Sequence, residues 1–231
     1  MVIICKHFLL FIFYSFVGWV LEEIHESVRE RKIVNRGFLV GPICPIYGFA
    51  SIFITNYISR YKEDFIVLFV LSVVLCGILE YFTSLLLEKI FKVRWWDYSD
   101  IRFNIEGRVT LLNLILFGVA SAVTIYFVHP HVVSFLESLP ETVIIVLAII
   151  IGIIGFIDTL FSVNIISRVS KTVTKVSKRI INRDSTYEIK AKVGKVLKDK
   201  IFSRRLFDAF PNFKINFDVI KKIRRKKKDS N

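Results

Sequence analysis

The chain has 231 residues, of which 54% are hydrophobic, and its mean hydropathy is +0.55. A soluble domain of this length does not need so large a share of apolar side chains, so the composition excludes an ordinary soluble protein and favours a membrane protein. The formal net charge of +13 arises mainly in the C-terminal segment.

Five apolar runs approach or exceed the roughly 18 to 20 residues that cross a bilayer as a helix. They cover residues 3–21, 41–59, 65–87, 109–128 and 143–163. Helices are expected because lipid offers backbone groups no partner outside a helix or a closed barrel, and the runs lack the two-residue alternation of barrel strands. We therefore predict an all-α polytopic membrane protein with five transmembrane helices. The first run lacks a small-x-small cleavage site, so we interpret it as a retained span rather than a signal peptide.

The segment from Asn35 to Gly48, where the second run begins, contains three Gly and two Pro residues within fourteen residues. Such a composition is unfavourable for a plain helix. It predicts either an irregular or re-entrant turn that is buried in protein or lines a wet cavity, or a loop followed by a helix that starts at proline. Both interpretations remain open from the sequence.

The basic residues predict the orientation of the spans. With five spans, the loops at 22–40 and 88–108 and the segment after 163 lie on one side and carry 30 of the 33 Lys and Arg residues. Positive charge collects on the cytoplasmic side, so the N-terminus is expected outside and the C-terminus inside. The residues at 129–141 contain no Lys or Arg and are expected to form an outer loop, in which His129 and His131 are ordinary loop residues.

The chain is expected to divide into a transmembrane domain, residues 1–163, and a basic cytoplasmic tail, residues 164–231. Apolar residues recur at helical spacing between Ile165 and Ile180, with Lys and Arg between them, which predicts an amphipathic basic helix on the membrane surface. A second helix is expected over 189–201, ending before Pro211. Basic tails bind nucleic acid or anionic lipid, and the membrane tether favours anionic lipid head groups over nucleic acid.

Several charged residues lie at membrane depth, all in the predicted cytoplasmic half. Glu80 and Asp158 are the two deepest acids, and Arg108 is the natural partner for either. We predict a polar pocket open to the cytoplasm and roofed by the aromatic loop at 95–104. Its candidate residues are Glu22, Arg36, Tyr47, Glu80, Trp95, Trp96, Asp97, Tyr98, Asn104, Arg108 and Asp158. Two alternative interpretations remain. In the first, the acids are helix-end residues whose side chains reach the interface, which is the interpretation we adopt for Glu88. In the second, the aromatic residues form an interfacial belt.

No known catalytic motif occurs in the chain. It has no phosphate-binding Gly-x-x-x-x-Gly-Lys-Ser/Thr loop, no Gly-x-Ser-x-Gly elbow and no His-Glu-x-x-His pair, so no catalytic residue is predicted. The three cysteines form no Cys-x-x-Cys pair and the histidines are scattered, so no metal or cofactor is predicted.

An ordered set of motifs resembles the bacterial membrane family of type IV ABC-transporter permeases over about residues 8–163. The motifs are Phe16-Val17-Gly18-Trp19-Val20-Leu21-Glu22, Asn35-Arg36-Gly37-Phe38-Leu39, Gly41-Pro42, Cys44-Pro45-Ile46-Tyr47-Gly48, Leu79-Glu80-Tyr81 with Glu88, Trp95-Trp96-Asp97-Tyr98-Ser99, Phe103-Asn104 and Gly107-Arg108. The stretch from Arg205 to Pro211 resembles a tail element of such proteins. The resemblance implies a multi-pass protein of the bacterial inner membrane with a transport role, and it supplies no catalytic residues.

Three classes of function remain open from the sequence. The first is a permease-like subunit that works with a separate ATPase. The second is a membrane-embedded enzyme or ligand binder with a cytoplasm-facing site, and the third is a scaffolding partner of other membrane proteins. The predicted outer half offers little polar lining for a transport path in one protomer, although a homo-oligomer could supply one. Substrate and direction of transport do not follow from the sequence.

Overall fold

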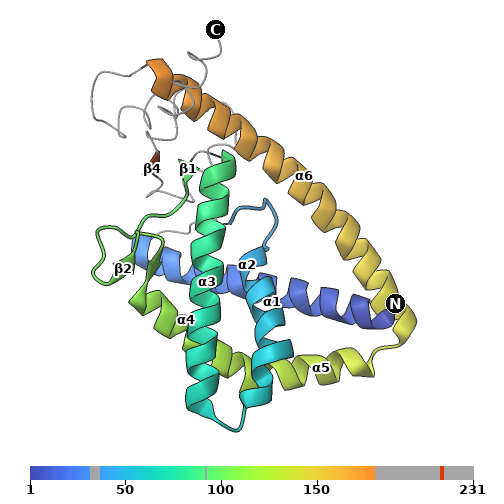
Figure 1. Cartoon of the computed structure of the whole chain (residues 1–231). Coiled ribbons are helices and arrows are strands. Elements are labelled where there is room, and N and C mark those ends of the chain that lie inside the picture. The colour runs from blue at the N-terminus through green and yellow to red at the C-terminus, as the bar shows by residue number, and fades with distance from the viewer. Residues whose placement is uncertain (32–36, 92, 180–213, 216–231) are drawn as a thin grey trace, which may run out of the picture.

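The computed structural model describes residues 1–31, 37–91, 93–179 and 214–215 of the chain. These residues are mostly helical, as predicted (Figure 1). The main helices are α1 (Val2–Glu30), α2 (Pro45–Phe53), α3 (Phe65–Phe91), α4 (Leu111–Val123), α5 (His129–Ser138) and α6 (Glu141–Arg179). The helix expected at 189–201 and the motif at 205–211 lie outside the described residues.

Four helical segments in the described part of the chain are long and apolar enough to cross a membrane. They are Val2–Val28, Phe65–Phe91, Leu111–Ser138 and Glu141–Lys171. Three of them contain a predicted apolar run, and Leu111–Ser138 covers the run at 109–128 except for Val109 and Thr110, which form β3. A continuous run of apolar side chains forms a helix in lipid because the backbone then has only its own hydrogen-bond partners. The protein is thus a multi-pass membrane protein.

The second predicted run forms a shorter helical segment. α2 is continued by a π-helical stretch, η1 (Ile54–Ile58), and by one 3-10 turn, η2 (Ser59–Tyr61). At about 1.5 Å per residue the segment extends about 25 Å, against a hydrocarbon core of roughly 30 Å. A fifth span is therefore still a prediction.

The residues expected to form an outer loop at 129–141 are mostly helical, so this prediction was wrong. α4 continues through a second π-helical stretch, η3 (Thr124–Val128), into α5, which contains both His129 and His131. Pro130 does not end the helix; it lies directly after the π-helical stretch, in the first turn of α5. His129 is not an ordinary loop residue, since its Nδ1 lies 2.8 Å from the Tyr14 hydroxyl of α1.

The strands gather at one end of the molecule, here called the strand end. β2 (Asn104–Ile105) pairs with β3 (Val109–Thr110), and β1 (Val93–Arg94) pairs with β4 (Lys214–Ile215), both antiparallel. Figure 1 shows the C-terminal ends of α3 and α6 at the strand end, while the η2–α3 turn and the α5–α6 link lie away from it. The segments expected on the cytoplasmic side are therefore close to one another.

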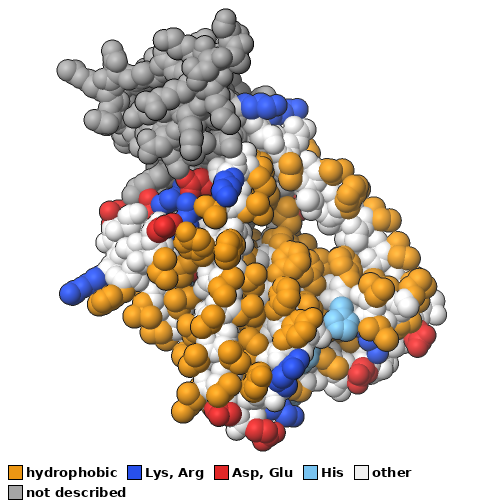
Figure 2. Space-filling view, viewed as in Figure 1, with side chains coloured by type: hydrophobic (Ala, Val, Ile, Leu, Met, Phe, Trp, Pro, Cys, Tyr) orange, Lys and Arg blue, Asp and Glu red, His pale blue; other side chains and the backbone are white. Residues whose placement is uncertain are grey.

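Among the described residues, two buried apolar clusters pack the bundle away from the strands. One joins α1, α5 and α6 around Leu9 and Ile144, and the other joins η1, α3, α4 and η3 around Ile54 and Leu68. Figure 2 shows hydrophobic side chains over the middle of the visible face, with charged side chains gathered toward its edges. This distribution is typical of a surface that contacts lipid between two aqueous boundaries.

α6 crosses the expected boundary between membrane domain and tail without interruption. The predicted helix after residue 164 is thus the continuation of α6 as far as Arg179, and residues 180–213 and 216–231 lie outside the described part. Ile166 and Val169 are buried, and the Ser170 hydroxyl donates a hydrogen bond to the Phe91 carbonyl at the end of α3. This portion of α6 therefore packs on the protein itself.

Candidate functional site

A cavity of about 380 Å³ lies inside the bundle. Side chains of α1, α2, α3 and α4 surround it, and Gly37, Phe38, Trp95, Trp96 and Tyr98 contribute to its wall near the strand end. Ile54 of η1 and Thr124 of η3 also line it. Both π-helical stretches therefore border the cavity, a position in which such irregular turns are often functional.

Close contact between α1 and α2 forms one wall of the cavity. Gly18 of α1 lies directly against the Tyr47 ring, so that a Cβ added at Gly18 would lie 2.2 Å from Tyr47 Cγ. Gly48 of α2 likewise meets Ser15, with 2.2 Å from an added Cβ to Ser15 Oγ. Glycine at both positions lets the two helices approach closely, as small residues commonly do in membrane bundles.

Two carboxyl groups line this mainly apolar cavity. The Tyr47 hydroxyl donates a hydrogen bond of 2.5 Å to Oε1 of Glu22. Glu80 of α3 is 6% exposed, and the Asn113 side chain of α4 lies beside its carboxyl group. Its Oε2 atom has no hydrogen-bond partner among the described residues. A buried polar atom without a partner is costly, so it marks a place where a ligand or proton would be stabilised.

Aromatic side chains form much of the rest of the lining. Eight of them border the cavity: Tyr14, Trp19, Phe38, Tyr47, Trp95, Trp96, Tyr98 and Phe117. These include all three tryptophans of the chain. Trp95 is 5% exposed and lies edge-on to the rings of Phe38 and Phe91, so it is held within the protein at the strand end.

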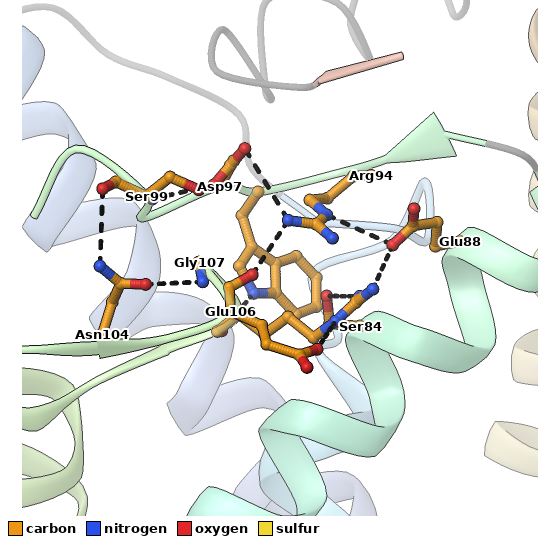
Figure 3. Close-up of polar contacts among 10 residues, drawn as sticks. Ser84, Glu88, Arg94, Asp97, Ser99, Asn104, Glu106 and Gly107 are labelled. Atoms are coloured by element: carbon orange, nitrogen blue, oxygen red, sulfur yellow. Dashed lines mark hydrogen bonds and ion pairs between the residues drawn. The ribbon is translucent and has the colours of Figure 1, made fainter. Parts of the chain in front are cut away.

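A network of charged side chains supports the loop that carries Trp95, Trp96 and Tyr98. We call Glu88, Arg94, Asp97, Glu106 and Arg108 the charge network (Figure 3). Its centre is Glu88, whose Oε2 lies 2.5 Å from Arg108 Nη2 and 3.2 Å from Arg94 Nε. Arg94 also donates to the Glu106 carbonyl, at 3.0 Å. The network therefore ties the end of α3 to both sides of the loop.

The expected pairing of Arg108 with Glu80 or Asp158 was wrong. Arg108 does not line the cavity, and its Nη1 atom donates instead to the Ser84 hydroxyl at 3.0 Å, beside the ion pair with Glu88. Glu88 is 4% exposed and ion-paired, so it is not a helix-end acid that reaches the interface. The physical reason is register: Ser84 and Glu88 share a face of α3 one turn apart, and the hairpin places Arg108 beside that turn.

Local turn chemistry holds the aromatic loop in shape. Glu106 and Gly107 have φ values of 50° and 66°, and the Arg108 N–H donates to the Ile105 carbonyl, so a tight turn with two positive φ angles lies within the three-residue link between β2 and β3. Asp97 Oδ1 accepts from the Ser99 N–H at 2.9 Å, which closes a second turn. The Trp96 indole donates to the Arg108 carbonyl at 3.0 Å, so its ring is anchored to the hairpin.

Residues 37–44 are irregular, and α2 begins at Pro45. The irregular turn and the helix that starts at proline, which the sequence offered as alternatives, therefore occur one after the other. Asp158 of α6 accepts from the N–H groups of Val40 and Gly41, at 3.1 and 3.0 Å. The Cys44 N–H donates to the Ser15 carbonyl at 2.9 Å. These contacts satisfy backbone donors that a helix would otherwise use, which makes the irregular segment tolerable inside a membrane protein. Asp158 thus positions a wall of the cavity and does not line it.

Asp158→Ala should lower the free energy of unfolding by about 1–3 kcal/mol, because the Gly41 N–H loses its acceptor and the Val40 N–H keeps only the Ser162 hydroxyl. Asp158→Asn keeps one side-chain oxygen as an acceptor, so its free energy of unfolding should fall by less. Unfolding in mixed micelles, followed by circular dichroism, measures both. Thr159→Ala, at the exposed neighbouring position, is the matched control. Equal stability of Asp158→Ala and the control would contradict the positioning role.

The structure brings together six of the predicted site residues at the cavity: Glu22, Tyr47, Glu80, Trp95, Trp96 and Tyr98. Asp97, Arg108 and Asn104 lie in the supporting loop, where Asn104 donates to the Ile101 carbonyl at 2.7 Å. Arg36 lies outside the described residues. The prediction did not include Glu88 or Ser84, which join the aromatic loop to α3.

A signal for the missed residues was present in α3. Ser72, Cys76, Glu80, Ser84 and Glu88 recur at every fourth position, and all five are buried. Residues four apart lie on one helix face, so the pattern is a polar stripe that faces the interior of the bundle. Reading the whole stripe, instead of Glu80 alone, would have indicated that Glu88 faces protein.

The fold and the cavity define a multi-pass membrane protein with an internal, aromatic-lined cavity. The chain matches the family model described as "Putative ABC-transporter type IV" over residues 9–163, which is more than half of its length. The chain belongs to this family, which confirms the resemblance seen in the sequence motifs. No curated protein and no solved structure matches it.

Proposed function

We propose that this protein is a permease-like subunit of a bacterial cell (inner) membrane transporter that receives a small ligand from the cytoplasm. The observation that carries the proposal is the cavity of about 380 Å³, which is walled by four helices and bordered at the strand end by the aromatic loop. Cavities of this size, mainly apolar with a few placed polar groups, are typical small-molecule sites. Family membership supports a transport role.

The proposed orientation places the strand end in the cytoplasm. Under the five-span topology, the basic loops and the tail lie on that side, as positive charge does in membrane proteins. The strand end carries Arg94 and Arg108, and the basic C-terminal part of α6 lies there as well. The basic residues beyond it are then available to anionic lipid head groups.

The packing at the end of the molecule opposite the strand end supports an arrangement in which the cavity opens to the cytoplasm. The apolar clusters around Leu9 and around Ile54 pack the bundle between the cavity and the end opposite the strands. Release to the outside would require these clusters to separate, or a second protomer to supply the path. The chain lacks a phosphate-binding loop, so ATP hydrolysis would come from a separate subunit that contacts the cytoplasmic loops.

Cys44 provides a direct test because this native residue lines the cavity. With Cys5→Ser and Cys76→Ala, only Cys44 remains to react. A membrane-impermeant maleimide should label it in inverted vesicles and not in right-side-out vesicles. In a cysteine-free background, Asp100→Cys should label from the inside, and His131→Cys, near the end of the Leu111–Ser138 segment away from the strand end, should label from the outside. Labelling of Cys44 only from the outside would overturn the proposal.

A further inference from the structure

The charged side chains among the described lining residues of the cavity are all acidic. They include the carboxyl groups of Glu22 and Glu80 and no Lys, Arg or His. The neighbouring basic groups are engaged elsewhere, since Arg108 and Arg94 pair with Glu88 in the charge network. An acid at membrane depth needs a partner or a proton, and neither Arg supplies one to the unpartnered Oε2 atom of Glu80.

The aromatic lining suits a particular kind of cation. The faces of Trp, Tyr and Phe rings attract a positive charge held within about 6 Å, most strongly where water is excluded. A hydrated metal ion would need several oxygen ligands, whereas this cavity presents mostly carbon. A cation that carries its own apolar groups can contact the rings and place its charge beside a carboxylate.

We propose that the cavity binds an organic cation, such as an ammonium or phosphonium ion with apolar substituents, with Glu80 as its counter-ion. The Glu22–Tyr47 pair gives a second polar contact on the opposite helices, and Trp95, Trp96 and Tyr98 cover the ligand at the strand end. This inference rests on the proposed function for the existence of a ligand in the cavity, and it adds the chemical class of that ligand.

Tryptophan fluorescence reports on this cavity because all three tryptophans line it. The full-length protein in nanodiscs is titrated with tetraphenylphosphonium, and tetraphenylborate serves as an anion of the same shape. Empty nanodiscs correct for partition of both ions into lipid. Saturable quenching by the phosphonium, with at least tenfold weaker quenching by the borate, is the expected result. Equal or stronger quenching by the borate overturns the inference, as does the absence of saturable quenching by either ion.

Variants assign the charge selectivity to Glu80. Glu80→Gln keeps the size of the side chain and should weaken phosphonium binding by about tenfold or more, because the buried counter-ion is lost. Glu63→Gln, at an exposed position in the η2–α3 turn, should bind as the native protein does. Unchanged affinity of a folded Glu80→Gln protein would remove Glu80 as the counter-ion and overturn the proposal.

A second measurement needs no change at Glu80. Bound phosphonium should slow the reaction of Cys44 with maleimide in the variant that retains only this cysteine, since Cys44 lines the same cavity. Absence of protection at saturating phosphonium would contradict binding in the cavity. Labelling of Cys44 from the cytoplasmic side without protection would leave the proposed function standing while the ligand class fails, so the two outcomes are distinguishable.

Discussion

Glu88→Gln and Arg108→Gln should each lower the free energy of unfolding by about 3–5 kcal/mol, whereas the double variant should lose less than the sum. The two side chains are each 5% exposed, and their charged atoms lie 2.5 Å apart. Removing one leaves the other charge buried with too little compensation, and removing both eliminates that penalty. Unfolding of the four proteins in mixed micelles measures the coupling.

An exposed basic residue in the same loop provides the control for this cycle. Arg102→Gln removes a positive charge at a solvent-exposed position and should change stability by less than about 1 kcal/mol. Strict additivity of Glu88→Gln and Arg108→Gln would mean that the ion pair does not hold the hairpin to α3. The single variants should also loosen the aromatic loop, because Trp96 is anchored to the Arg108 carbonyl.

Gly18→Ala and Gly48→Ala should each destabilise the protein by about 1–3 kcal/mol, although alanine is the better helix former. The added Cβ would lie 2.2 Å from Tyr47 Cγ in the first case and 2.2 Å from Ser15 Oγ in the second. The backbones of α1 and α2 would have to move apart, which would also displace the Tyr47 hydroxyl from Glu22, to which it donates a hydrogen bond.

Gly155→Ala is the matched control for these substitutions. Gly155 is in α6, and nothing lies within 4 Å of a Cβ added there. Its replacement should leave stability unchanged or raise it by up to about 1 kcal/mol, as removal of a helical glycine does. Thermal unfolding in detergent compares the three variants. Equal stability of Gly18→Ala and Gly155→Ala would contradict the close contact between α1 and α2.

Much of the architecture followed from local composition. Each of the four long apolar helical segments overlaps a predicted run, because membrane insertion depends on the length and polarity of a single segment. The error at 129–141 had a local cause as well. The loop was predicted because the apolar runs at 109–128 and 143–163 leave 129–141 between them, whereas Pro130 is compatible with the first turn of α5 after the π-helical stretch.

The cavity could be predicted in part. The aromatic loop and Glu80 stood out because polar and aromatic groups between membrane spans are costly to keep without a purpose. Their neighbours depend on the rotation of each helix about its axis, and a single sequence does not specify that rotation across different helices. In the structure Arg108 therefore pairs with Glu88, and Asp158 accepts hydrogen bonds from the Val40 and Gly41 N–H groups.

By itself the sequence determined a helical membrane protein, the family to which it belongs, and the loop whose rings border the cavity, since all of these are properties of contiguous residues. Only the tertiary structure decided which acid pairs with Arg108 and which is left facing the cavity. That choice depends on how α1 and α2 meet at Gly18 and Gly48 and on how the hairpin lies against α3. These contacts join residues far apart in the chain, and close packing determines which polar groups can reach one another.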